Sequence, residues 1–200
     1  MYAVTACRSG GEPDWDERRL LQAFWRAFAK SPARVISYGG KGFDLAVLRL
    51  RSLLHGLSAE VWHRSGSKWE CYTQRYAPDW HCDLMEQLSD YGACAKMGLD
   101  EVARAMGLPG KVGGHGSEVE AMVNRGEIDQ VRAYCEGDCL NLFGLYARWC
   151  LLTGRTDEDG YKATLRSLTS YLEAEQGSRL HLGEFLDRWQ NNGSCPVATA

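Results

Sequence analysis

The chain has 200 residues, 44% hydrophobic and 24% charged, which is typical of a globular protein with a sizeable core, and we expect a single domain over residues 1–200. The formal net charge of −3 excludes a broad basic surface, so any contact with nucleic acid has to come from a local site. No apolar run reaches the ~20 residues of a membrane span and the N-terminus has no signal-peptide pattern, so we expect a cytoplasmic protein without a membrane partner.

Hydrophobic spacing predicts two short strands, over residues 2–7 and 35–38, and a series of helices, the first capped by Asp14 or Asp16. Strands followed by helices indicate α/β architecture. The helices are expected, in chain order, over residues 17–31, 44–55, 84–88, 99–106, 117–126, 127–152, 161–175 and 181–190. In the long helix, the residues expected to face inward are Ile128, Val131, Cys135, Leu142, Leu145 and Trp149.

Local signals add detail to this pattern. Asp83 is expected to cap the helix over 84–88, and Ser117 with Glu120 is typical of a capping box. Residues 58–76 have no clear period and are rich in Trp, Arg and Ser. We expect them to form an irregular, partly exposed loop, placed where it could lie beside a substrate groove.

A glycine-rich turn, Gly39-Gly40-Lys41-Gly42, follows the second predicted strand and places Asp44 at a strand-to-helix junction. Such a junction suits a carboxylate that helps to hold divalent ions, which lie about 4 Å apart in two-metal phosphodiester hydrolysis. The alternative is an ordinary helix-capping aspartate, and the local sequence alone favours this alternative. The turn does not match a P-loop, because its lysine is followed by glycine and not by Ser or Thr.

Tyr134 and Asp138 are four residues apart in the predicted long helix and therefore share a face. A carboxylate on or near a buried face is unfavourable unless it is paired or binds a metal. Tyr134 alone would be an ordinary core aromatic residue with a satisfied hydroxyl group. The two together, with Gly137 between them, favour a functional site.

The other polar residues have simpler interpretations. Lys111, at the start of a glycine loop over 111–116, could contact a phosphate, although most exposed loop lysines are only solvated. His81 has no partner at a recognisable spacing and is given no role. The eight cysteines contain no Cys-x-x-Cys pair and lack further ligands at zinc-site spacing, so we expect reduced, mostly buried thiols.

In their order along the chain, these motifs resemble the second and third motifs of the DEDDy 3′–5′ exonucleases. Over nearly its whole length the chain is similar to bacterial predicted 3′–5′ exonucleases related to the proofreading domain of family B DNA polymerases. Residues 37–48 (SYGGKGFDLAVL) resemble the second motif, usually written Ser-Trp-Asn-Gly-x-Gly-Phe-Asp-Leu-Pro-x-Leu. Residues 134–138 (YCEGD) resemble the third motif in its tyrosine form, with Ala133 before them.

The resemblance implies an RNase H-like (DnaQ-like exonuclease) mixed sheet flanked by helices. It also implies two-metal hydrolysis of terminal phosphodiesters, with Mg²⁺ or Mn²⁺, in single-stranded DNA or other nucleic-acid 3′ ends. Asp44 and Asp138 would be metal ligands and, with Tyr134 orienting the attacking water, the catalytic residues. The residues implied in substrate binding are Gly39, Gly40, Gly42, Phe43 and Lys111.

One departure limits the resemblance. The family's first motif, an Asp-x-Glu that supplies two of four acidic ligands from a central strand, does not occur in this sequence. Residues 2–7 resemble the strand after it, so we expect an N-terminally truncated chain that lacks the first central strand and is catalytically incomplete as it stands. Glu12, Asp14 and Asp16 lie past that strand and are poor substitutes. The alternative is a degenerate exonuclease-fold domain that binds nucleic acid or a protein partner without catalysis.

Overall fold

The computed structural model describes residues 1–111 and 116–192, so most of the predicted glycine loop lies outside the described residues. The chain forms two compact units. The helical unit comprises residues 1–9 and the chain from Gly98 onward, and the strand unit comprises residues 10–97. The structure is mostly helical with a small parallel sheet, which confirms the predicted α/β class. Among the described helices, none combines the length and the apolar character that crossing a membrane requires.

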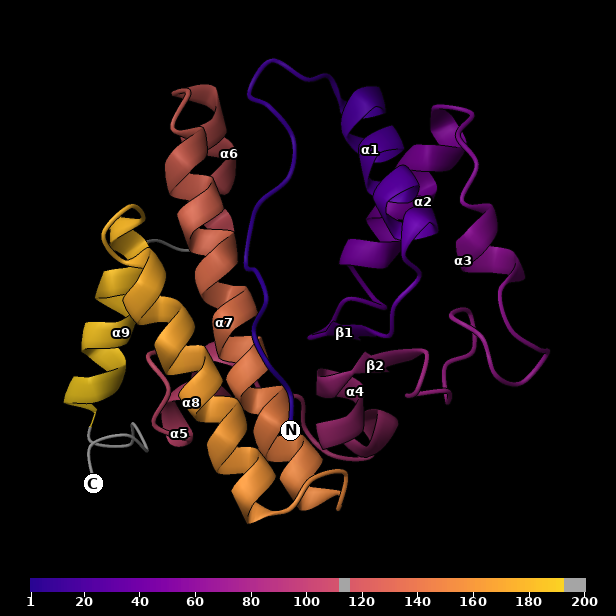
Figure 1. Cartoon of the computed structure of the whole chain (residues 1–200). Helices are drawn as coiled ribbons and strands as arrows, with labels where there is room; N and C mark the ends of the chain where they lie inside the picture. The colour runs from indigo at the N-terminus through magenta and orange to yellow at the C-terminus, as the bar shows by residue number, and fades with distance from the viewer. Residues whose placement is uncertain (112–115, 193–200) are drawn as a thin grey trace. The chain divides into compact units, whose positions relative to one another are not determined.

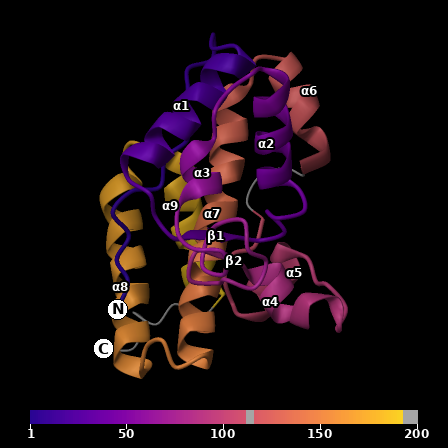
Figure 2. The same cartoon turned by 90° about the vertical axis from the view of Figure 1, so that its right-hand side faces the viewer.

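The strand unit contains a two-stranded parallel sheet with Val35 opposite His81 and Ser37 opposite Asp83. The two strands lie side by side in Figure 2. They end at the same edge of the sheet, so the glycine turn after the first strand meets the last residue of the second. The elements are α1 (Glu17–Lys30), β1 (Val35–Ser37), α2 (Asp44–Leu54), α3 (Glu60–Arg64), β2 (His81–Asp83), α4 (Leu84–Leu88) and a 3₁₀ turn η1 (Asp90–Gly92).

The first helix forms as its cap and period predict. The Asp16 side chain accepts a hydrogen bond from the Arg19 amide at 2.7 Å, and the helix buries Leu21 and Trp25. The spacing of Leu20, Leu21, Phe24, Trp25 and Phe28 predicts a buried stripe, but Leu20 and Phe24 are 40% and 38% exposed, so the stripe is narrower than this spacing predicts.

Residues 58–76 are not irregular throughout, because they include the helix α3. This helix has only five residues, too few to show a period in the sequence. Its Trp62 is 2% exposed and stacks on Tyr72, with ring centroids 4.9 Å apart. Together with Trp25 and Leu45, these rings form the buried core of the strand unit.

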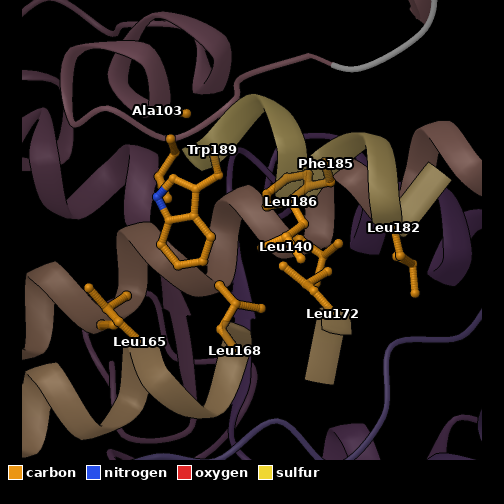
Figure 3. Packing of buried hydrophobic residues seen from close by; sticks show 11 residues of the cluster. Ala103, Leu140, Leu165, Leu168, Leu172, Leu182, Phe185, Leu186 and Trp189 are labelled. Carbon is orange, nitrogen blue, oxygen red and sulfur yellow. The ribbon is translucent and has the colours of Figure 1, made fainter. Parts of the chain in front are cut away.

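The helical unit is built on the long helix α7, beside which α5 and α8 pack, with α9 on α8 (Figure 1). Side chains of α7, α8 and α9 point toward one another in a buried cluster that includes Leu140, Leu168 and Trp189 (Figure 3). The elements are α5 (Leu99–Ala105), a 3₁₀ turn η2 (Gly116–Glu118), α6 (Val119–Asn124), α7 (Ile128–Leu152), α8 (Glu158–Glu175) and α9 (Leu180–Asn191).

The predicted strand over residues 2–7 is not a strand. The segment is extended but pairs with no other strand in the described part of the chain. Its amide groups donate instead to side chains of α8: Tyr2 N to Thr164 Oγ1 (2.9 Å), Val4 N to Ser167 Oγ (3.1 Å) and Cys7 N to Tyr171 OH (3.0 Å). The amides of Tyr2, Val4 and Cys7 therefore bond to a helix and not to a sheet.

Two further predictions in the helical unit are wrong in detail. Ser117 does not cap α6, which begins after the turn η2 without a side-chain cap. On α7, Leu145 and Trp149 are buried as expected, but Cys135 is exposed. The buried face of this helix also includes polar and small residues, Glu136, Gly137, Asn141 and Gly144, which an apolar period does not identify.

Candidate functional site

The glycine turn of the strand unit is braced by a buried carboxylate. Asp83 is 1% exposed, and it accepts hydrogen bonds from the amides of Gly39 (2.7 Å) and Lys41 (2.9 Å). It also caps α4, as predicted, by accepting from the Met85 amide at 3.2 Å. Because Asp83 ends β2 and the turn follows β1, the strand register brings these distant segments together.

Two positions in the turn require glycine. Gly39 has φ +74°, a conformation that L side chains rarely adopt. A Cβ on Gly40 would lie 2.6 Å from the Cβ of Ser37, so no larger residue fits without a shift. The two glycines therefore restrict the backbone conformation of the turn, which leads into α2 and sets the position of Asp44.

Asp44 is the first residue of α2 and is exposed. The cap position belongs to Phe43, which makes no side-chain cap bond, so the alternative that Asp44 is an ordinary N-cap is wrong. Its Oδ2 lies over the turn, 3.4 Å from where a Cβ on Gly40 would be. The carboxylate has no hydrogen bond or ion pair with residues in the described ranges, and Phe43 beside it is 70% exposed.

Replacing Asp83 with Asn tests the brace. Asn has one acceptor oxygen where Asp has two, so a buried amide of the turn loses its partner, and we expect a loss of about 2 kcal/mol in the free energy of unfolding. Urea denaturation measures this loss. Asp79→Asn is the matched control, because its side chain is 70% exposed and its ion pair with Arg34 contributes at most about 1 kcal/mol. Equal effects of the two substitutions would contradict the role of Asp83.

In the helical unit, Tyr134 and Asp138 interact on one face of α7 as their spacing predicts. The Tyr134 hydroxyl hydrogen-bonds the Asp138 carboxyl, and both residues are half-buried. Burial raises the pKa of Asp138, against the hydrogen bond from Tyr134 and the positive charge of Lys111. Burial and the nearby Asp138 charge raise the pKa of Tyr134 to about 12, so the phenol keeps its proton and acts as a donor at neutral pH.

The loop that ends at Lys111 is held near Asp138 by Asn141 and Asp100, which were not among the predicted site residues. Asn141, one turn after Asp138, is 1% exposed and bonds both the amide (3.1 Å) and the carbonyl (2.7 Å) of Gly110. Asp100 accepts from the Lys111 amide at 2.7 Å. These bonds fix the backbone of Lys111, whose charge acts on Asp138. The signal available in the sequence was a polar Asn between the apolar residues Leu140 and Leu142.

The predicted site residues are thus divided between the two units. Gly39, Gly40, Gly42, Phe43 and Asp44 belong to the strand unit, whereas Lys111, Tyr134 and Asp138 belong to the helical unit. Within the described ranges, no group of three or more His, Cys, Asp or Glu side chains is arranged to hold a metal ion. The roles of these residues in catalysis and substrate binding stay predictions.

Comparison with known proteins identifies the family. No curated protein and no solved structure matches the chain significantly. A family model described as a predicted 3′–5′ exonuclease related to the exonuclease domain of PolB matches residues 2–189. The match covers both units, with the glycine turn of one and the Tyr134–Asp138 pair of the other. The chain therefore belongs to the family of predicted 3′–5′ exonucleases related to the exonuclease domain of PolB.

Proposed function

We propose that the protein is a divalent-metal-dependent nuclease that removes nucleotides from the 3′ ends of single-stranded DNA. The observation that carries the proposal is the Asp138 carboxylate, which is kept half-buried on α7 beside the Tyr134 hydroxyl although burial disfavours its charge. A carboxylate kept in such surroundings is typical of a functional site. The family membership supports the reaction, and we propose an RNase H-like arrangement of the fold for the same reason.

The candidate ligands fit a hard divalent cation in their chemistry. Asp44 and Asp138 both offer carboxylate oxygens, which Mg²⁺ and Mn²⁺ prefer. When bound, such ions would neutralise charge on a phosphodiester and lower the pKa of a bound water. Two carboxylates are only part of a two-metal ligand set, and the sequence has no Asp-x-Glu before Asp44 to add to them.

Three further residues of the chain would orient the reacting group and bind the substrate. Tyr134, protonated at neutral pH, is suited to donate a hydrogen bond and orient a group at Asp138, not to accept a proton. The exposed Phe43 ring beside Asp44 offers a surface on which a terminal base can stack. Lys111, whose charge acts on Asp138, would attract a phosphate.

A direct assay tests the proposal. A single-stranded oligonucleotide labelled at its 5′ end is incubated with the full chain and Mg²⁺ or Mn²⁺, and parallel samples contain EDTA. We expect a ladder of products shortened from the 3′ end that forms slowly, because the Asp-x-Glu ligands are missing, and that EDTA abolishes. An oligonucleotide with a blocked 3′ end is the matched control. Products that appear equally in EDTA, or that shorten from the 5′ end, would contradict the proposal.

A second function is favoured by one observation, the missing Asp-x-Glu. The protein would then bind single-stranded nucleic acid, or a protein partner, without cutting it. This alternative predicts that a 3′-labelled oligonucleotide is retained by the chain and stays intact in Mn²⁺. The ladder of shortened products excludes it.

A further inference from the structure

A cavity of about 200 Å³ lies within the strand unit, beside its aromatic core. This volume exceeds the roughly 30 Å³ that one water occupies in the liquid, and it is below the ~300 Å³ at which pockets for drug-sized ligands begin. It therefore suits one small chemical group. The residues that line the cavity include Lys41, Arg49, Trp62, Arg75, His81 and Glu86.

The charges around this cavity favour an anion. Lys41, Arg49 and Arg75 are cations from three different segments, the glycine turn, α2 and the loop before β2. Among the residues that line the cavity, one carboxylate, that of Glu86, carries the opposite charge. His81 adds no charge at neutral pH, because burial and the nearby cations Lys41 and Arg49 lower its pKa to about 4. The cavity thus keeps an excess of positive charge.

Glu86 holds two of these cations in place. It is 8% exposed; its Oε1 pairs with Arg75 at 2.8 Å, and its Oε2 lies 3.4 Å from Lys41 Nζ but has no hydrogen-bond partner in the described ranges. Long basic side chains lose conformational freedom when they bind an anion, and this loss is smaller where they are already ordered. The carboxylate therefore prepares a site for an anion.

Trp62 supplies the second, independent observation. Its side chain is buried, with 2% exposure, and it lines the cavity. Its indole N–H has no acceptor among the residues of the described ranges. Buried donors in folded proteins nearly always have a partner, which can be a bound ligand. An acceptor oxygen inside the cavity would satisfy this donor.

We propose that this cavity binds a phosphate group, carried by a nucleotide or by a nucleic-acid strand. A tetrahedral phosphate presents acceptor oxygens in several directions, which matches cations from three segments and an indole donor. A planar carboxylate presents only two oxygens. Lys41 lies three residues before Asp44, so the group would bind next to the candidate catalytic turn. The inference of phosphate binding is drawn from the cavity alone. The inference that a nucleic acid supplies the phosphate rests on the proposed function.

Calorimetric titration of the full chain with inorganic phosphate, in EDTA at constant ionic strength, tests the proposal. We expect saturable binding at millimolar concentrations or below, weakened at least about tenfold by Arg49→Gln and by Trp62→Phe. Arg49 is exposed, and its hydrogen bond to the Leu45 carbonyl, at 3.2 Å, lies within its own helix, so Arg49→Gln should fold normally. Arg64→Gln is the matched control, since Arg64 is an exposed arginine on α3 outside the cavity.

Further titrations identify the source of the phosphate. Tighter binding of thymidine 5′-monophosphate than of a thymidine dinucleotide with a single phosphodiester supports a site for the released nucleotide. The reverse order supports a site for the strand. The proposal is overturned if phosphate does not bind, if acetate binds as tightly, or if Arg49→Gln and Trp62→Phe both bind phosphate like the unaltered chain. Because EDTA prevents catalysis, these results are independent of whether the chain is a nuclease.

Discussion

Asp138→Asn is expected to abolish nucleotide release from 3′ ends without lowering the thermal stability of the protein. Asn keeps the size of the side chain and can still accept a hydrogen bond from Tyr134, but it lacks the charge that a divalent cation requires. Loss of one such ligand removes several kcal/mol of transition-state stabilisation, which is at least about a hundredfold in rate. Because burial raises the pKa of Asp138, its charged form opposes folding at neutral pH, and its removal should leave the melting temperature unchanged or slightly higher.

Asp129→Asn is the control for this experiment, because Asp129 lies on the same helix with a side chain that is 95% exposed. It should change neither the rate nor the melting temperature appreciably. The rate of the unaltered chain should rise with pH as the Asp138 carboxyl loses its proton, since only the carboxylate binds metal. Retained cleavage in Asp138→Asn would remove this residue from the site. A large fall in melting temperature would make Asp138 structural.

Glu136→Gln is expected to lower the free energy of unfolding by about 3 kcal/mol. Glu136 is 7% exposed and accepts hydrogen bonds from the Ser9 amide (2.8 Å) and hydroxyl (3.0 Å) and from Arg179, and its Oε2 lies 2.7 Å from His181 Nε2. The substitution leaves Arg179 with only part of its charge balanced. The expected loss is at the low end for buried ion pairs, because the Arg179 and His181 side chains are 20% and 24% exposed.

The pH dependence of this loss has a definite sign. Burial acts to raise the pKa of Glu136, but hydrogen bonds from His181, Ser9 and Arg179 outweigh it, so the pKa is lower than usual. The carboxylate therefore stabilises the fold above its unfolded-state pKa, near 4.5, and this contribution is lost as the pH falls through the lower folded-state value. The difference between the unaltered chain and Glu136→Gln should shrink below pH 4.5 in urea denaturation curves.

Glu184→Gln provides the comparison, because Glu184 pairs with Arg188 on α9 and its side chain is 51% exposed. We expect a loss below about 1 kcal/mol that depends little on pH. If Glu136→Gln lowers the free energy of unfolding as little as Glu184→Gln does, the bonds of Glu136 do not hold residues 1–9 in place.

How much of the fold could be predicted from the sequence depended on the length of each element and on the sequence separation of its contacts. The helices α1, α2, α7, α8 and α9 have periods or caps that a single sequence displays, and all were predicted. The helix α3 is too short for a period, and the segment over residues 2–7 has the composition of a strand although its amides bond to α8. Local composition cannot reveal which partner such a segment will meet.

The candidate site shows the same limit. The spacing of Tyr134 and Asp138 was sufficient to predict their contact, because helix geometry alone brings them together. The brace on the glycine turn was not predictable in this way, since Asp83 is 44 residues from Gly39 and reaches it only through the strand register. Asp83 was correctly predicted to cap a helix, but its two carboxylate oxygens also accept hydrogen bonds from the glycine turn.

The bonds from Asp83 also determine how the strand unit can move. A loop held only by its own residues can open by itself. Here the amides of Gly39 and Lys41 donate hydrogen bonds to Asp83, the last residue of β2. Opening the turn therefore means releasing β2 and the first turn of α4 as well. The turn, the strand end and the helix start form one cooperative unit of local unfolding. Asp44 is consequently carried by a segment that is ordered before any ligand arrives.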